Sequence, residues 1–143
     1  IRDRRKDVKN RARLCRPEIE FVLSRQEDCG VLMKQLEEGI LPLRVTHNDT
    51  KLNNILFDAD TDKGLCIIDL DTIMPGLAAN DFGDSIRFGA STAEEDEPDL
   101  DKVHFDISLY DIYAKGYLEM AKDVLTPAEI ESLPWGARLM TLE

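Results

Sequence analysis

The sequence has few cysteines and no long apolar segment. Its three cysteines are odd in number and form no Cys-x-x-Cys motif, so we expect reduced thiols in a cytoplasmic protein. It also lacks a run of about 18 apolar residues and a visible secretory signal, so no transmembrane helix is predicted. We therefore expect no membrane partner.

Positive charge is also scarce. The chain has 18 Arg and Lys residues against 29 Asp and Glu residues, which gives a formal net charge of −11. Eight of the basic residues lie in residues 1–16, where the local net charge is +6, and the densest acidic stretch is residues 94–101. Binding to a nucleic-acid backbone requires a positive face. We therefore expect no nucleic-acid partner and interpret both segments as solvated helix charge.

The first half of the chain predicts helix followed by a small β element. With 143 residues, it has the length of about one domain. Helical spacing runs from Pro17 to Leu36, with Gly39 placed to end the helix, and residues 1–15 are a candidate for another. The apolar runs NILF (54–57) and LCIID (65–69) flank a turn-rich linker, which predicts a β-hairpin whose second strand ends at Asp69.

The second half of the chain predicts mostly helix. Residues 72–80 are predicted to form a loop and residues 81–90 a short helix, followed by an exposed acidic segment, 91–101. A longer amphipathic helix is predicted over residues 103–121, and Thr126-Pro127-Ala128-Glu129 has the form of a capped helix start. We interpret the aromatic residues of these helices as packing residues: Tyr110, Tyr113, Tyr117 and Trp135.

The main chemical signal is a polar cluster near the predicted hairpin. His47, Asp49 and Asn54 fit the spacing H-x-D-x-x-x-x-N, in which the aspartate orients or receives a hydroxyl proton and the asparagine holds Mg²⁺. Asp69 ends the hairpin and offers a second oxygen ligand. Magnesium takes few protein oxygens and completes its shell with phosphates and water. The pattern therefore predicts phosphoryl transfer from ATP to an alcohol.

The roles of the neighbouring residues stay open at this point. We favour a loop-bracing role for His47, because one histidine beside one carboxylate makes a poor zinc site. Asp71 is either a further metal carboxylate or an exposed turn residue. Lys51 either contacts phosphate and neutralises the surroundings of Asp49 or is exposed to solvent.

Residues 81–83 spell Asp-Phe-Gly, the letters of the magnesium motif of protein kinases. A metal-binding aspartate must leave the strand that pairs with NILF, and Asp69 does so. We therefore assign Asp81 to structure, at a helix start where the helix dipole favours a carboxylate. Asp84 either braces the catalytic loop or only belongs to the helix's first turn. Arg87 either contacts substrate or pairs with an acid.

Three segments, HNDTKLNNILFD, LCIIDLDTIMPG and NDFGDSIRFGAS, together resemble the catalytic half of the aminoglycoside phosphotransferase-like kinases. This superfamily shares the protein-kinase fold and includes choline, homoserine and sugar kinases. The amino-acid sequence of these segments is most similar to the N-acetylhexosamine 1-kinase branch. Enzymes of this branch use ATP to phosphorylate the anomeric hydroxyl of N-acetylglucosamine or N-acetylgalactosamine.

The resemblance implies an α+β fold, namely the mostly helical C-terminal lobe of a protein-kinase-like fold with a small β-hairpin at the catalytic cleft. It implies Asp49 as the catalytic aspartate, His47 as a brace, and Asn54 and Asp69 as magnesium ligands. None of the eight glycines forms a Gly-x-Gly. We therefore expect residues 1–143 to be a fragment, inactive alone, whose nucleotide-clamping N-terminal lobe precedes Ile1.

Three alternatives remain. The first is a kinase of the same fold that acts on choline, homoserine or an aminoglycoside. The second is a non-catalytic, pseudokinase-like module that binds a metal or a partner protein. The third is a two-metal hydrolase that uses His47, Asp49, Asp69 and Asp71, which the shortage of histidines disfavours.

Overall fold

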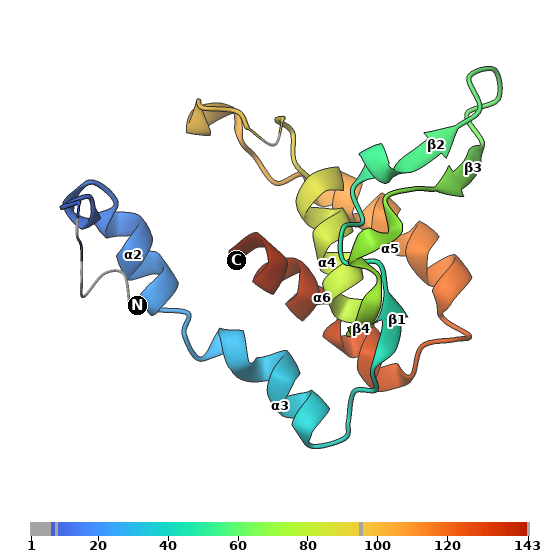
Figure 1. The fold of residues 1–143 in the computed structure, drawn as a ribbon, viewed down its shortest axis with the longest axis horizontal. Coiled ribbons are helices and arrows are strands. Elements are labelled where there is room, and N and C mark those ends of the chain that lie inside the picture. Colours follow the sequence, from blue (N-terminus) through green and yellow to red (C-terminus); the bar gives the residue numbers. More distant parts are fainter. Residues whose placement is uncertain (1–6, 8, 95, 143) are drawn as a thin grey trace. The chain divides into compact units, whose positions relative to one another are not determined.

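The computed structural model describes residue 7, residues 9–94 and residues 96–142. Mostly helical, with two small two-stranded sheets, it is the α+β fold predicted from the sequence (Figure 1). The chain forms two compact units, residues 1–31 and residues 32–143. None of the described helices combines the length and the apolar character needed to cross a bilayer.

The helix predicted from Pro17 to Leu36 is in fact two helices, α2 (Arg16–Leu23) and α3 (Val31–Glu37). Ser24 ends α2, and its hydroxyl donates a 2.7 Å hydrogen bond to the Phe21 carbonyl. A hydroxyl bonded to the preceding turn competes with helix continuation, which explains the break. Gly39 follows α3 with a positive φ of 71°, as expected of a glycine that ends a helix.

The helix predicted over residues 1–15 falls partly on residues 1–6 and 8, which lie outside the described residues. Within the rest of that segment the structure has a short 3₁₀ turn, η1 (Ala12–Leu14). A second 3₁₀ turn, η2 (Asp28–Gly30), precedes α3. All three cysteines are exposed free thiols.

The predicted hairpin is confirmed: β2 (Ile55–Phe57) pairs antiparallel with β3 (Gly64–Ile67). Its turn is held by Asp58, whose carboxylate accepts hydrogen bonds from the Thr61 hydroxyl and from two backbone N–H groups. The Thr61 hydroxyl is the largest cause of the lowered pKa of Asp58.

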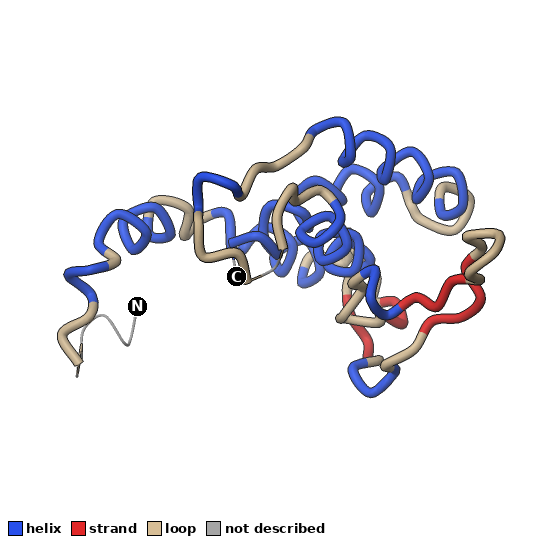
Figure 2. The backbone as a smooth tube through the Cα atoms, turned by 90° about the horizontal axis from the view of Figure 1, so that it is seen from above, coloured by secondary structure: helices blue, strands red, loops and turns tan. Residues whose placement is uncertain are grey.

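A second strand pair was not predicted. β1 (Arg44–Thr46) pairs antiparallel with β4 (Met74–Gly76), and both are labelled in Figure 1. The loop predicted over residues 72–80 therefore contains a strand; strands are drawn in red in Figure 2. The strand is only three residues long, and Pro75 argues against a strand in a sequence pattern. It is tolerated because this sheet has two strands and each of them is an edge.

Three helices form the main body of residues 32–143: α4 (Ala78–Gly89), α5 (Ile107–Ala121) and α6 (Pro127–Leu142). The predicted capping box of α6 is confirmed, because Thr126 N–H donates to the Glu129 carboxylate and Glu129 N–H donates to the Thr126 hydroxyl. The helix α5 begins four residues after the predicted start, because the Asp106 side chain caps it by accepting from Ser108 N–H. The acidic segment before it forms a loop and the 3₁₀ turn η5 (Leu100–Lys102).

The helices α4 and α6 cross at two glycines. A Cβ atom on Gly83 would overlap the Gly136 carbonyl, and one on Gly136 would overlap the Ala79 carbonyl. This close approach lets Phe82, which is 1% exposed, enter the core between the two helices. Tyrosine rings of α5 lie around Phe82, in agreement with the predicted packing role of Tyr110, Tyr113 and Tyr117.

Candidate active site

The polar cluster lies in the loop that joins β1 to β2, residues 47–54. Two residues after the end of β1, Asn48 adopts a positive φ of 64°. Asparagine tolerates this left-handed conformation better than most residues do. The loop ends in the 3₁₀ turn η3 (Leu52–Asn54), which turns the chain back into β2. The loop therefore folds on itself and brings its two ends together.

This folding places Asn54 against Asp49. The Asn54 amide Nδ2 donates to the Asp49 carbonyl oxygen at 2.8 Å and to the Asp49 carboxylate at 2.9 Å. Asn54 is 9% exposed, so these bonds fix a nearly buried side chain. Because both partners are acceptors, the NH₂ group must face Asp49 and the amide oxygen Oδ1 points elsewhere. The other carboxylate oxygen of Asp49, Oδ1, lies 3.5 Å from the Lys51 Nζ, whereas Asn54 bonds to Oδ2.

Two carboxylates of α4 hold the loop. Asp81, in the first turn of the helix, accepts the backbone N–H groups of His47 and Asn48, each at 2.8 Å. The structural role predicted for Asp81 is thus confirmed, although its carboxylate binds the loop as well as standing at a helix start. Tyr117 lies near it; burial raises the pKa of the Tyr117 hydroxyl, and the negative charge of Asp81 adds to this effect.

Asp84 is the second brace, which decides between the two roles left open for it. Its buried carboxylate accepts the Thr50 N–H at 2.7 Å and pairs with Arg87 at 3.0 Å. Arg87 therefore pairs with an acid, one of the two roles considered for it. The Thr50 hydroxyl donates to the Asp81 carbonyl at 2.7 Å. The residues on both sides of Asp49 are therefore fixed to one helix.

The strand that was predicted to end at Asp69 ends two residues earlier, at Ile67, so Asp69 lies just beyond the hairpin. The preceding residue, Ile68, donates its N–H to the Asn54 carbonyl at 2.9 Å, so the chain reaches Asp69 next to the end of the loop 47–54. Asp69 is exposed and left-handed, with φ 62° and ψ 59°. This conformation is uncommon for a residue other than glycine, and such residues cluster at functional sites.

His47 and Asp71 have different surroundings. His47 Nε2 lies 3.1 Å from the Ile68 carbonyl, so the nitrogen that faces this acceptor carries the proton. Its Nδ1 is buried without a hydrogen-bond partner among the described residues. The contact ties the loop 47–54 to the residue before Asp69, which suits the bracing role expected of His47. Asp71 is exposed in the 3₁₀ turn η4 (Leu70–Thr72).

The donors of this site fit a magnesium ion. Asn54 keeps its amide oxygen directed away from Asp49, and Asp69 offers an exposed carboxylate one residue after Ile68, whose N–H bonds to the Asn54 carbonyl. Both are hard oxygen ligands of the kind that Mg²⁺ prefers. Among the residues that the structure describes, no group of three or more His, Cys, Asp or Glu side chains is arranged to hold a metal ion. The four-residue cluster of the hydrolase alternative is therefore not formed.

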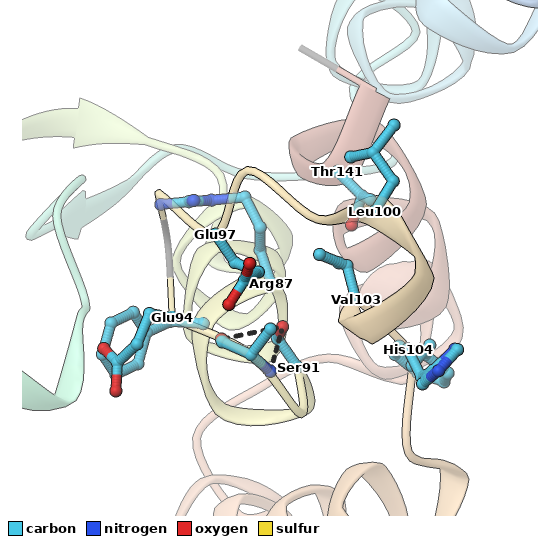
Figure 3. Close-up of a pocket in the computed structure, with 11 residues that line it drawn as sticks. Arg87, Ser91, Glu94, Glu97, Leu100, Val103, His104 and Thr141 are labelled. Carbon is cyan, nitrogen blue, oxygen red and sulfur yellow. Dashed lines mark hydrogen bonds between the residues drawn. The ribbon is translucent and has the colours of Figure 1, made fainter.

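A cavity of about 310 Å³ borders the brace formed by Asp84 and Arg87. Figure 3 shows Arg87 and Glu97 on one side of this cavity and Leu100 and Val103 on the other. Its size lies at the lower end of the range for small-molecule pockets. The Arg87 side chain both lines the cavity and pairs with the carboxylate that holds Thr50.

Sequence reasoning missed the small polar residues that connect these parts. Thr50 and Ser85 bond between the loop and α4, because the Ser85 hydroxyl lies 3.3 Å from the Thr50 carbonyl. Asn48 and Thr72 connect the loop to the segment after Asp69. Asn48 Nδ2 donates to the Thr72 carbonyl at 2.9 Å, and the Thr72 hydroxyl donates to the His47 carbonyl. Threonine, serine and asparagine are common in any loop, so the sequence held no signal that identified these residues.

Comparison with known families gives one finding. The family model described as the phosphotransferase enzyme family (APH) matches residues 2–120. The matched range includes the loop 47–54, the hairpin and all of α4, so it contains every residue of the site described above.

Proposed function

This chain belongs to the phosphotransferase enzyme family, and we propose that it forms the catalytic lobe of an ATP-dependent kinase that phosphorylates a hydroxyl of a small molecule. The observation that carries the proposal is the double hydrogen bond from Asn54 to Asp49. It holds the carboxylate in one orientation and leaves the amide oxygen directed away from Asp49, where it could bind a separate ligand. A merely polar loop has no need of this arrangement.

In the proposed reaction Asp49 orients the acceptor hydroxyl and accepts its proton. Phosphoryl transfer has a loose transition state, so positioning and charge neutralisation supply most of the catalysis. General-base assistance contributes ~10²–10⁴ in rate, or about 3–5 kcal/mol. Asp81 and Asp84 accept hydrogen bonds from backbone N–H groups of the loop on both sides of Asp49, which fixes the position of Asp49 relative to α4.

Asn54 and Asp69 are the residues that would hold magnesium, and Asp71 is a candidate for a further carboxylate. When bound, the metal neutralises charge on the phosphates of ATP. We propose that Lys51, whose Nζ lies 3.5 Å from Asp49 Oδ1, contacts the transferred phosphoryl group from the same side.

We propose an N-acetylhexosamine as the acceptor, phosphorylated at its anomeric hydroxyl, because the sequence of the three motif segments is most similar to the N-acetylhexosamine 1-kinase branch. Choline, homoserine and aminoglycosides are the competing acceptors. A panel of these alcohols, with ATP consumption as the readout, distinguishes them: turnover should be at least tenfold faster with N-acetylglucosamine or N-acetylgalactosamine. Preference for a cationic acceptor would overturn this assignment and leave the kinase proposal standing.

We also propose that the nucleotide is clamped by a second lobe, since none of the eight glycines here forms a Gly-x-Gly. The 143 residues alone should then show negligible turnover. A cytoplasmic location is part of the proposal, because free thiols are the normal state there.

The decisive test is Asp49→Asn in the full-length polypeptide. Asparagine keeps the shape of the side chain but cannot take the proton, so kcat should fall by ~10²–10⁴ while nucleotide affinity stays within about threefold. Asp62→Asn is the matched control, because Asp62 is an exposed aspartate of the hairpin turn, at a positive φ of 54° that asparagine also accepts.

Full turnover in Asp49→Asn would refute the proposal. A titration with Mg²⁺ then examines the non-catalytic alternative. A catalytic site needs phosphate to complete the metal's ligand shell, so Mg²⁺ should bind much more tightly with nucleotide than without it. Equal binding in both cases would favour the metal-binding module.

A further inference from the structure

The segment that follows Asp69 is tied back to the catalytic loop by four residues, which we name the clasp: Thr46, His47, Asn48 and Thr72. The Thr72 hydroxyl donates to the His47 carbonyl at 2.6 Å. In the opposite direction, Asn48 Nδ2 donates to the Thr72 carbonyl at 2.9 Å. The Thr46 hydroxyl lies 3.0 Å from Asn48 Oδ1 and 2.9 Å from the Met74 carbonyl. Hydrogen bonds therefore run both ways between the two segments.

The backbone allows this contact only because Gly76 has no side chain. Gly76 lies opposite Arg44 in the β1–β4 pair, and a Cβ atom there would overlap the Thr46 hydroxyl. Thr46 is buried, at 2% exposed. The clasp is thus built into a close approach of the two strands and does not depend on mobile surface side chains.

Asp69 is held from both sides. On the side before it, Ile68 N–H bonds to the Asn54 carbonyl, and the Ile68 carbonyl faces His47 Nε2 at 3.1 Å. On the side after it, the 3₁₀ turn η4 ends at Thr72, which the clasp fixes. The left-handed backbone of Asp69 therefore lies between two anchored points.

We propose that Asn48 and Thr72 are positioning residues that hold Asp69 in its left-handed conformation, so that its carboxylate is preset for the metal before any ligand binds. A left-handed backbone costs most non-glycine residues about 1–2 kcal/mol, and although aspartate adopts it more readily than most, the contacts on both sides of Asp69 add to its preference. Without the clasp, Asp69 returns to the extended or right-handed region, and its carboxylate moves away. The metal-directed part of this inference rests on the proposed function.

Two variants remove the clasp by different routes. Thr72→Val keeps the shape and β-branching of threonine but has no hydroxyl. Asn48→Gly removes the side-chain amide and still accepts the positive φ of 64°. Thr72→Ser, which keeps the hydroxyl, should restore wild-type behaviour. Thr61→Val is the control, because the Thr61 hydroxyl makes a bond of similar length, 2.7 Å, in the exposed hairpin turn.

The first measurement uses no ligand. Hydrogen exchange of residues 68–76, followed by mass spectrometry in the full-length polypeptide, should be about tenfold faster in Thr72→Val and Asn48→Gly than in wild type. Thr72→Ser and Thr61→Val should match wild type. Unchanged exchange in both clasp variants would overturn the proposal. If one variant does not fold, the other decides.

The second measurement is the Mg²⁺ concentration that gives half-maximal turnover. It should rise about tenfold in Thr72→Val and Asn48→Gly, with the KM of the acceptor unchanged, as expected from the loss of roughly one hydrogen bond's free energy. Faster exchange with an unchanged Mg²⁺ requirement would overturn the positioning role. If Asp69→Ala also left the Mg²⁺ requirement unchanged, the error would lie in the proposed metal role of Asp69.

Discussion

Replacement of Glu129 by glutamine should destabilise the protein near neutral pH and much less in acid. The Glu129 side chain is 3% exposed and forms two bonds with Arg44, from Nε at 2.8 Å and from Nη2 at 2.7 Å. It also accepts the Thr126 N–H that caps α6. Foremost through the bond from Arg44, these contacts lower the pKa of Glu129 from 4.5 to about 2.

The magnitude follows from this pKa. A carboxyl group whose pKa is lowered by folding stabilises the folded state above its unfolded pKa, and the contribution is lost as the pH falls through the folded pKa. For Glu129 the full effect is present above about pH 4.5 and disappears toward pH 2. It amounts to about 2–3 kcal/mol at pH 7. The lower value allows for the side chain of Arg44, which is 34% exposed and therefore screened by water.

Urea unfolding of wild type and Glu129→Gln between pH 7 and pH 2.5 tests this. The difference in unfolding free energy should be about 2–3 kcal/mol at pH 7 and should shrink steadily below pH 4.5. Glu131→Gln is the matched control, because Glu131 is an exposed glutamate of the same helix and should change stability by less than about 0.5 kcal/mol. Two curves that stay parallel down to pH 2.5 would refute the reasoning.

Two further predictions concern the support of the site. Gly136→Ala should cost more than about 3 kcal/mol of unfolding free energy, because the added methyl would overlap the Ala79 carbonyl. Gly116→Ala, whose methyl meets no described atom within 4 Å, should be neutral or stabilising in thermal melts. Asp84→Asn should lower kcat about tenfold and change the KM values little, since it weakens the bond that holds the catalytic loop; unchanged kcat would argue against this brace.

The parts of the fold that the sequence predicted well are those with local causes. The hairpin follows from two apolar runs on either side of a turn-rich linker, and the start of α6 follows from Thr126 and Glu129, which are three residues apart and bond to each other. In these cases the residues that identify the element also stabilise it. A pattern read along the chain therefore contains the physical reason for the structure.

The errors have causes that a pattern does not contain. Apolar residues continue at helical spacing across the break between α2 and α3, and the break depends on how the Ser24 hydroxyl turns toward the Phe21 carbonyl. The strand β4 exists because β1 lies opposite it, 28 residues away at the pair of Thr46 and Met74. A three-residue strand with a proline has little preference of its own and takes its conformation from its partner.

The same distinction applies to the site. The contact of Asn54 with Asp49 joins residues only five apart, and the motif spacing had already drawn attention to both of them, although not to the bond between them. The braces join residues 33 or 34 apart, and the sequence gives no sign of which carboxylate meets which N–H group. Asp81 and Asp84, three residues apart, share a face of α4, and this spacing let both reach the loop.

The Asp-Phe-Gly sequence at residues 81–83 shows why position in the fold decides what a short motif does. Each of its residues has a structural role. The Asp81 carboxylate accepts N–H groups of the loop, and Phe82 is buried in the core. Gly83 has no side chain, which allows the close contact with the Gly136 carbonyl. None of the three is free to leave these contacts for a metal. Asp69 lies two residues beyond β3, is exposed and has a left-handed backbone, and its side chain makes no cap hydrogen bond to the 3₁₀ turn η4 that follows it. Its oxygen atoms are hard ligands of the kind that Mg²⁺ prefers, so among these acids we propose Asp69, not Asp81, as the metal ligand.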